Sequence, residues 1–433
     1  MEDLLHYCWK YRLYQQDNLK TSDGQTVEVI STGTHNTDAG PDFFNAKIKI
    51  DGTLWVGNVE IHNKASDWKL HHHDSDKAYD TVVLHVVSTD DAQVRRTTGE
   101  LVPQLVLNVP KYVMENSKTL LASEKAFPCL SYISYINRIH LLSWQEALLG
   151  ERLENKAKFV MNLLDLYRND WNEVLYIVLS RNFGFGVNGD ALEMLAKSLP
   201  LRFIRKQSKS QTQVEALLFG QAGMLGEEKI DPYHRLLRRE YLYLQHKFEL
   251  KPIEGSAIRC MRIRPNGFPS VKLAQLAAIL GAHDTLFSLM IEARTPGELK
   301  ELFRVSASDF WTNRYNFDKY SKPVEKRISE TVINNILINT VVPVFMAYGK
   351  FGHEEYIDRA FRLIMSIPPE ENAIVRRYKN AGFSVSCAGD SQALIELSRE
   401  YCEKKKCLSC RVGYNLLKLD KLLVSTNIFL PKE

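Results

Sequence analysis

The sequence has few cysteines and no long run of apolar residues. Its seven cysteines are an odd number in a chain of 433 residues, which excludes the paired disulfide framework of a small secreted protein. The most apolar segment, residues 332–346, is interrupted by Asn334, Asn335, Asn339 and Pro343. It therefore falls short of the roughly 18 apolar residues that indicate a membrane helix. The first residues also lack the basic start and apolar core of a signal peptide. These absences predict a soluble, cytoplasmic protein without a membrane partner.

A strong charge of one sign is also missing, since the net charge is only +4. The charge is nevertheless unevenly distributed. Residues 1–130 carry 13 Lys and Arg against 18 Asp and Glu, whereas residues 131–433 carry 43 against 34. An acidic first part suits a bound cation, and a basic second part suits a polyanion. Ordinary solvated faces explain the same numbers, so both interpretations stay open.

The pattern of residues 1–125 predicts an α+β domain, and the chain is long enough for two or three domains. Short segments of alternating or β-branched residues indicate strands, and Asp51-Gly52 is typical of a hairpin turn. The predicted elements are a helix over 2–17, strands over 26–31, 44–50 and 54–62, a helix or turn over 71–80, and strands over 81–87 and 105–109.

Residues 126–433 show helical spacing instead, which predicts a mainly α-helical second domain. No repeat of fixed period is present, and this excludes a solenoid. The segment 325–348 is expected to be the longest helix, kinked or ended near Pro343. The other predicted helices cover 141–164, 171–179, 189–198, 213–219, 233–248, 271–280, 391–404 and 410–418.

The residues that indicate chemistry are Gly-Pro-Asp at 40–42 and Glu-Ile-His-Asn-Lys at 60–64. Asp42 begins a predicted strand after a Gly-Pro turn, and Glu60 and His62 project from one face of the next strand. If that strand continues, Lys64 joins them. Two carboxylates on adjacent strands suit Mg²⁺ or Mn²⁺, and such an ion activates water and neutralises charge on a phosphodiester.

At these residues the chain resembles the PD-(D/E)XK nuclease superfamily, whose motif combines Pro-Asp, a later Asp or Glu, and a Lys two places on. The resemblance covers residues 2–110 and implies a restriction-endonuclease-like mixed sheet with flanking helices. It also implies hydrolysis of DNA or RNA, with Asp42 and Glu60 as metal ligands. A first-helix acid is implied as well, with Glu2 and Asp3 as candidates.

The chain departs from this motif at one position, because His62 stands where the superfamily has Lys. Either His62 or Lys64 would then assist hydrolysis. The departure also supports a second hypothesis, a non-catalytic nucleic-acid-binding or scaffold protein that retains the fold. The whole chain further resembles an uncharacterised bacterial protein family, which implies no activity.

Seven of the twelve histidines lie at or before His85, near several aspartates. Histidine and carboxylate side chains together suit zinc or manganese. Adjacent histidines diverge, so at most two of the triplet 71–73 can share one ion. A polar loop with exposed imidazoles is the alternative, and contact of His71 or His73 with a scissile phosphate is another. The residues considered are His62, His71, His72, His73, Asp74, Asp76, Asp80 and His85.

The spacing Cys402-x4-Cys407-x2-Cys410, with Cys387 fifteen residues before Cys402, is typical of metal ligands. Four thiolates suit structural zinc or an iron–sulfur cluster. The lysines at 404–406 are expected to lower the thiol pKa values. Reduced cysteines packed at a helix junction are the alternative.

Three basic groups in the second part suit a nucleic-acid partner, whose phosphates would bind in a salt-sensitive way. No DNA-binding or RNA-binding signature accompanies them, and a solvated surface explains each group equally. The groups are Arg202, Arg205 and Lys206; Arg235, Arg238 and Arg239; and Arg259, Arg262 and Arg264.

Overall fold

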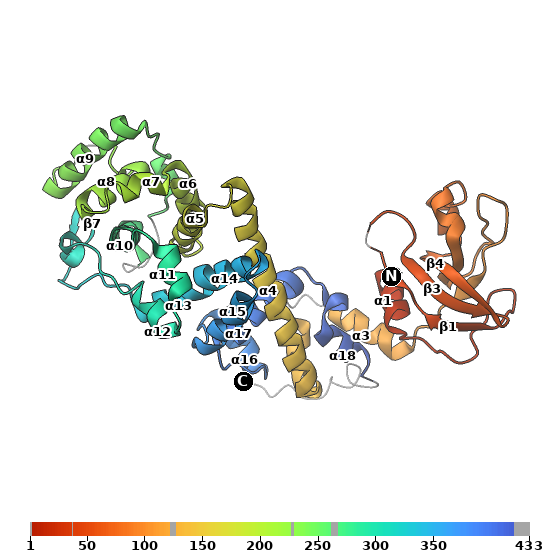
Figure 1. The fold of residues 1–433 in the computed structure, drawn as a ribbon. Coiled ribbons are helices and arrows are strands. Elements are labelled where there is room, and N and C mark those ends of the chain that lie inside the picture. Colours follow the sequence, from red (N-terminus) through yellow and green to blue (C-terminus); the bar gives the residue numbers. More distant parts are fainter. Residues whose placement is uncertain (1, 37, 122–126, 227–228, 261–266, 420–433) are drawn as a thin grey trace. The chain divides into compact units, whose positions relative to one another are not determined.

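The computed structural model describes residues 2–36, 38–121, 127–226, 229–260 and 267–419. It divides into two compact units (Figure 1). The first contains Met1–Trp144, Arg377–Phe383 and Leu397–Glu433, and the second contains Gln145–Arg376 and Ser384–Glu396. A mixed sheet with flanking helices, followed by a mainly helical region, confirms the predicted α+β class.

The sheet of the first unit has the strand order β1-β3-β4-β5-β6, with β2 beside β3. The β1–β3 and β3–β4 pairs are antiparallel, and the β4–β5 and β5–β6 pairs are parallel. The predicted strands are therefore present, and β2 is an addition that the sequence pattern did not indicate. The strands are β1 (Val27–Ser31), β2 (Thr34–His35), β3 (Phe43–Ile50), β4 (Thr53–Lys64), β5 (Val82–Thr89) and β6 (Gln104–Val106).

Local sequence explains the central hairpin and its neighbour. Asp51 and Gly52 both have positive φ angles, 46° and 80°, as the tight turn between β3 and β4 requires. Buried Phe43, Ala46 and Ile48 line β3. Strand β5 is buried from Val82 to Val87, as is typical of a central strand in the parallel part of a sheet.

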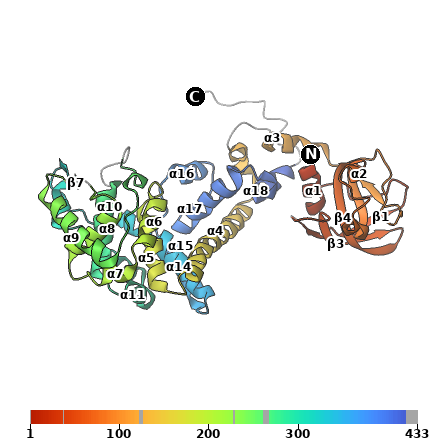
Figure 2. The same cartoon turned by 90° about the horizontal axis from the view of Figure 1, so that it is seen from above.

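Helix α1 (Glu2–Tyr11) contacts β4 (Figure 2). Its buried Trp9 donates from Nε1 to the carbonyl oxygen of Thr32, at 3.1 Å. The helix ends earlier than the predicted residue 17, because Arg12 adopts a left-handed φ of 54° and donates to the carbonyl oxygen of Ile30. The predicted helical link after β4 consists of α2 (Asp67–Leu70) and a 3₁₀ turn over Lys77–Thr81.

The C-terminal segment belongs to the first unit. Helix α18 (Arg411–Leu417) contacts α3 (Lys111–Leu121), and the Asn116 amide donates to the carbonyl oxygens of Leu416 and Leu419. A π-helical stretch over Leu397–Cys402 and a 3₁₀ turn over Cys407–Ser409 precede α18. The predicted domain boundary between residues 125 and 126 was based only on the change from strand patterns to helical patterns. It stays a prediction.

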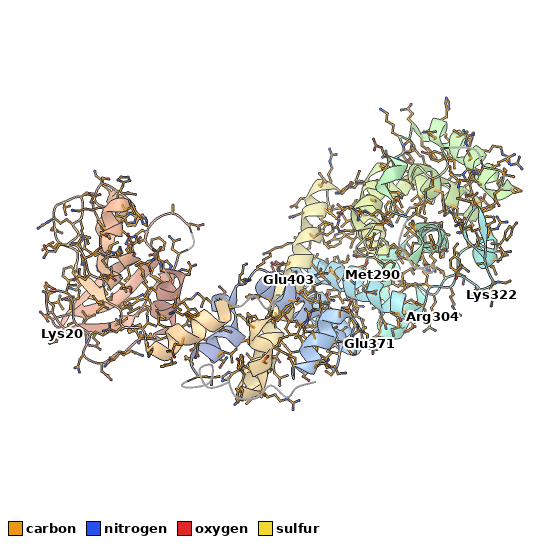
Figure 3. The ribbon with its side chains drawn as sticks, turned by 180° about the vertical axis from the view of Figure 1, so that it is seen from behind. Lys20, Met290, Arg304, Lys322, Glu371 and Glu403 are labelled. Carbon is orange, nitrogen blue, oxygen red and sulfur yellow. The ribbon has the colours of Figure 1, made fainter. Side chains whose placement is uncertain are left out.

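The second unit is built mainly of helices (Figure 3). It also contains a small hairpin of β7 (Arg314–Asn316) and β8 (Lys319–Tyr320). Its elements are α5 (Trp171–Phe183), α6 (Gly189–Ser198), α7 (Leu201–Arg205), α8 (Gln211–Gln221), α9 (Pro232–Phe248), α10 (Pro269–Ala282), α11 (Leu286–Glu292), α12 (Pro296–Glu301), α13 (Glu330–Ile336), α14 (Val342–Lys350), α15 (Glu355–Ser366), the start of α16 (Ala373–Asn380) and α17 (Ala388–Glu396), together with most of α4 (Arg138–Leu166).

The expectation that residues 325–348 form the longest helix is wrong, since α4 is longer, with 29 residues. Helices α13 and α14 are continuous through a π-helical stretch, Leu337–Val341, so Pro343 lies inside one helical run. The Asn339 carbonyl oxygen, which the missing N–H of Pro343 leaves without its helical donor, accepts from Asn182 Nδ2 at 2.6 Å. Within the described ranges, only Glu330–Lys350 is long and apolar enough for a membrane span as a single helix, and most of it is buried like a core helix of a soluble protein.

Candidate metal centre

The turn before β3 positions Asp42. The Asn36 side chain donates to the carbonyl oxygen of Pro41 at 3.1 Å, and its backbone N–H donates to the carbonyl oxygen of Asp42 at 2.7 Å. A register shift follows within β3, where Asn45 has a left-handed φ of 56°. Such bulges re-aim side chains at functional sites. The Gly-Pro-Asp turn and the bulge together orient Asp42 toward β4.

The structure brings Asp42 and Glu60 together across the β3–β4 pair. The backbone N–H of Asp42 donates to Glu60 Oε2 at 3.1 Å, and the N–H of Ile61 donates to Asp42 Oδ2 at 2.8 Å. The Glu60 side chain is buried, whereas that of Asp42 is 21% exposed. Burial raises the pKa of Glu60, His73 counteracts this in part, and the charge of Asp42 raises it further.

The first helix contributes a histidine that the sequence patterns did not single out. His6 Nε2 lies 3.2 Å from Asp42 Oδ2. Burial lowers the pKa of His6, but the Asp42 carboxylate and the charge of Glu2 raise it more, and the net shift is upward. The candidate first-helix acids thus differ: Glu2 acts on His6, and Asp3 lines a cavity. The early position of His6 in a helix next to the sheet was the available signal.

Four histidines surround Glu60, and we call them the histidine cluster: His62, His71, His73 and His85. His62 Nδ1 lies 2.9 Å from His85 Nε2, and His62 Nε2 lies 3.0 Å from His71 Nδ1. His73 Nε2 lies 3.2 Å from Glu60 Oε1. His72, in contrast, is exposed and has a left-handed φ of 63°. This backbone reversal lets His71 and His73 face His62 while His72 does not.

Two members of the histidine cluster, His62 and His85, are uncharged at neutral pH. Burial, reinforced by neighbouring imidazoles, lowers the pKa of His62 to about 4 and that of His85 to about 3. His62 therefore does not replace the positive charge of a lysine. Lys64 lies at the exposed end of β4, where its N–H donates to Asp67 Oδ2 at 3.0 Å. Its described contacts do not include Asp42 or Glu60.

Aromatic rings hold the histidine cluster in place. Tyr79 stacks on His73 with ring centroids 3.6 Å apart. The buried Trp68 ring lies 5.4 Å from His73 and 5.1 Å from His85. Trp68 also packs with Val82, Val94 and Val102, so it is a core residue as well as a wall of the site.

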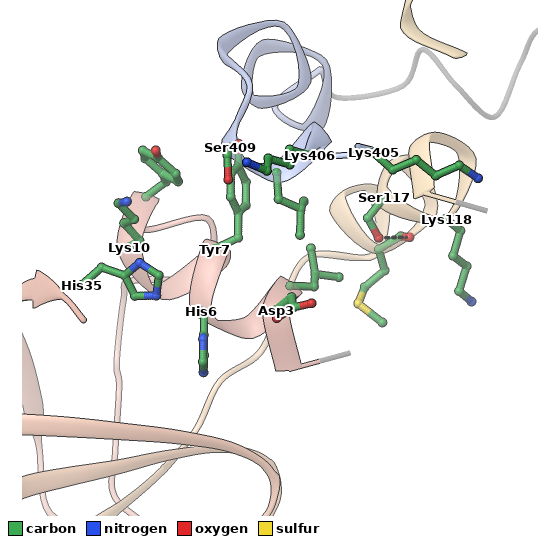
Figure 4. A pocket seen from close by; sticks show the side chains of 14 residues that line it. Asp3, His6, Tyr7, Lys10, His35, Ser117, Lys118, Lys405, Lys406 and Ser409 are labelled. Carbon is green, nitrogen blue, oxygen red and sulfur yellow. Dashed lines mark hydrogen bonds between the residues drawn. The ribbon is translucent and has the colours of Figure 1, made fainter. Parts of the chain in front are cut away.

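A cavity of about 640 Å³ adjoins His6 in the first unit. Its lysines come from α1, α3 and the C-terminal segment: Lys10, Lys118, Lys405 and Lys406 (Figure 4). We call it the lysine cavity. Because His6 lines this cavity and also contacts Asp42, the cavity lies beside the carboxylate pair. Its positive charge suits a phosphate-bearing ligand.

Cys402, Cys407 and Cys410 belong to the first unit, whereas Cys387 belongs to the second, where its Sγ lies 3.5 Å from Met365 Sδ. Burial raises the pKa of Cys402 to about 12 and also raises the pKa values of Cys407 and Cys410. Lys405 lowers the pKa of Cys407 as expected, but burial raises it more, so the net shift is upward and not the predicted lowering. Metal binding by these cysteines stays a prediction.

The basic groups of the second unit have separate environments. Arg205 donates to Asn172 Oδ1 at 2.7 Å, and Arg235, Arg238 and Arg239 line a shallow depression on α9. Arg262 and Arg264 lie outside the described residues.

Comparison with known proteins gives a family but no characterised relative. No curated protein and no solved structure matches the chain. The model of the family described as protein of unknown function, DUF2851, matches residues 2–373, and the chain therefore belongs to this family.

Proposed function

We propose that this protein is a metal-dependent nuclease that hydrolyses phosphodiester bonds of DNA or RNA, with Mg²⁺ or Mn²⁺ at Asp42 and Glu60. The observation that carries the proposal is the reciprocal bonding of the two carboxylates to the backbone of adjacent strands. Support comes from the order of elements along the chain, because a helix, strands, a helical link and a further strand follow one another as the resemblance to PD-(D/E)XK nucleases implies, with β2 as an addition. Free thiols throughout the described chain accord with the proposed cytoplasmic location.

The residues present fit a divalent ion. Each carboxylate uses one oxygen for a backbone N–H, which fixes its orientation. His6 Nε2 lies 3.2 Å from Asp42, and His73 Nε2 lies 3.2 Å from Glu60. Both nitrogen atoms are buried, and neither forms a directed hydrogen bond. Oxygen ligands completed by water suit Mg²⁺ or Mn²⁺. When bound, such an ion would lower the pKa of its water and neutralise charge on the phosphate.

The lysine cavity supports nucleic acid as the substrate. Its four lysines come from three segments of the first unit and line the cavity together with His6. A phosphate backbone bound there would have its neighbouring phosphodiester close to Asp42. Lysine–phosphate contacts release counterions, so binding should weaken steeply with salt.

A non-catalytic nucleic-acid-binding protein is the second candidate, and a specific observation favours it. His62 stands at the position of the motif lysine and is uncharged. The described contacts of Lys64 do not include either carboxylate, Asp42 or Glu60. Such a protein would bind nucleic acid through the lysine cavity without cutting it.

The test is a cleavage assay on the full-length protein with labelled single-stranded DNA, double-stranded DNA and RNA, each with Mg²⁺ or Mn²⁺. We expect cutting that is lost in Asp42→Asn and in Glu60→Gln, since either change removes a charged metal ligand. Glu28→Gln is the matched control, because Glu28 is exposed on β1 of the same sheet and pairs with Lys49.

Circular dichroism of each variant verifies that the fold is retained. Unchanged cutting in both site variants would reject the assignment to Asp42 and Glu60. Salt-dependent binding without cutting under either metal would reject the nuclease and support the second candidate.

A further inference from the structure

Donor atoms of three histidines converge where β4 meets the loop after α2, with Glu60 beside two of them. His62 Nε2 lies 3.0 Å from His71 Nδ1 and 3.6 Å from Glu60 Oε1, and His73 Nε2 lies 3.2 Å from the same Glu60 oxygen. In the part of the chain that the structure describes, only His62, His71 and His73 form a group of three metal-binding side chains with all donor atoms within 4.8 Å of one another.

Hydrogen bonding alone does not account for this arrangement. His73 is 7% exposed, and its Nε2 has no directed hydrogen bond despite the carboxylate oxygen 3.2 Å away. Ligands at about 2.0–2.1 Å from a tetrahedral ion lie about 3.3 Å from one another. The 3.0 Å between His62 Nε2 and His71 Nδ1 is close to this value, and the donor atoms of all three histidines lie within 4.8 Å of one another.

A second layer of residues orients these ligands. With His62 Nε2 directed at a cation, the proton of His62 resides on Nδ1 and is donated to His85 Nε2, 2.9 Å away. Such outer hydrogen bonds set the tautomer of metal-binding histidines. Stacking on Tyr79 fixes the His73 ring in the same way.

We propose that His62, His71 and His73 bind a transition-metal dication, with Zn²⁺ as the preferred ion. Three imidazole nitrogens suit zinc, whereas Mg²⁺ requires oxygen ligands. The inference deepens the proposed function, because Glu60 of the carboxylate pair contacts His73. It is nevertheless tested by metal binding and does not depend on cutting.

The experiment uses full-length protein stripped with a chelator and titrated with Co²⁺, whose visible absorption reports tetrahedral nitrogen and oxygen ligation. Zn²⁺ should displace the Co²⁺, and Mg²⁺ in large excess should not. We expect about one equivalent of Co²⁺ in this site and a rise in the thermal unfolding temperature with Zn²⁺. His71→Asn and His73→Asn should each lower the affinity at least about tenfold, since each removes a ligand.

His72→Asn is the matched control, because His72 is exposed, adjacent and not directed at the site, and Asn tolerates its left-handed backbone. His71 is exposed, so His71→Asn keeps the test valid if the buried His73 variant fails to fold. Cys402→Ser separates this site from the cysteines and should leave the titration unchanged.

Equal Co²⁺ binding in wild type, His71→Asn and His73→Asn would overturn the inference, as would absence of Zn²⁺ binding or its loss in Cys402→Ser. Failure here is distinct from failure of the proposed function. Zn²⁺ binding without cutting supports this site and rejects the nuclease. Cutting with Mg²⁺ but no Zn²⁺ binding does the reverse.

Discussion

At the scale of single residues, His62 and His85 make the metal-free protein sensitive to acid. Unfolded histidine titrates near about 6.5, whereas burial lowers the folded pKa values to about 4 and about 3. Between these values the unfolded chain binds more protons, so stability falls as the pH falls from about 7 to about 4. Each histidine contributes up to about 1.4 kcal/mol per pH unit. The raised pKa of Glu60 acts in the opposite direction.

Urea unfolding with a chelator present, at several pH values, measures this slope. His85→Gln should give a shallower pH dependence than wild type, because it removes one titrating group. His246→Gln, an exposed histidine of the second unit, should leave the slope unchanged. Parallel curves for wild type and His85→Gln would contradict the prediction.

At the scale of elements, the close packing of β4 against the start of β5 requires a glycine at position 57. A Cβ at Gly57 would lie 2.3 Å from Val83 Cγ1 and 2.8 Å from the carbonyl oxygen of Thr81. The second atom is backbone, so the residue that directly precedes β5 must shift. Gly57→Ala should destabilise the first unit by about 1–3 kcal/mol, the usual cost of overpacking.

Thermal unfolding measures the effect, with Gly150→Ala in α4 as the control. A Cβ at Gly150 meets no atom within 4 Å, and alanine favours a helix, so that variant should be neutral or more stable. If both variants unfold at the wild-type temperature, the β4–β5 contact is less constrained than the structure indicates.

At the scale of the whole molecule, we expect charge to decide where a polyanion binds. Lys405→Asn with Lys406→Gln removes two charges from the lysine cavity, and Asn suits the left-handed φ of 51° at Lys405. We expect weaker binding of a labelled single-stranded oligonucleotide. The salt slope should fall by about 1.4, at about 0.7 per lost phosphate contact.

Fluorescence anisotropy at several NaCl concentrations gives both quantities. Lys319→Asn with Lys322→Gln is the control, since it removes the same charge from exposed residues at β8 in the second unit (Figure 3). Equal losses in the two double variants would mean that net charge, and not the cavity, governs binding.

Elements that depend on interactions between residues close in sequence were predicted correctly, and features that depend on distant residues were not. Alternation in β3, the turn at Asp51 and Gly52, and the spacing of α6 reflect interactions between near neighbours, and these elements appear where the pattern put them. The prediction of the C-terminal end of α1 was wrong, because a single left-handed residue, Arg12, stops the helix. No local pattern reveals that conformation.

By itself the sequence determined the α+β class and the order of helix, strands, helical link and further strand along the first part of the chain, because hydrophobic periodicity and turn residues act locally. Only the tertiary structure decided that His6 reaches Asp42, that His71 and His73 turn toward His62 while His72 does not, and that residues 397–419 return to the first unit. These outcomes depend on contacts between segments distant in the chain and on one left-handed residue, for which the linear pattern carries no signal.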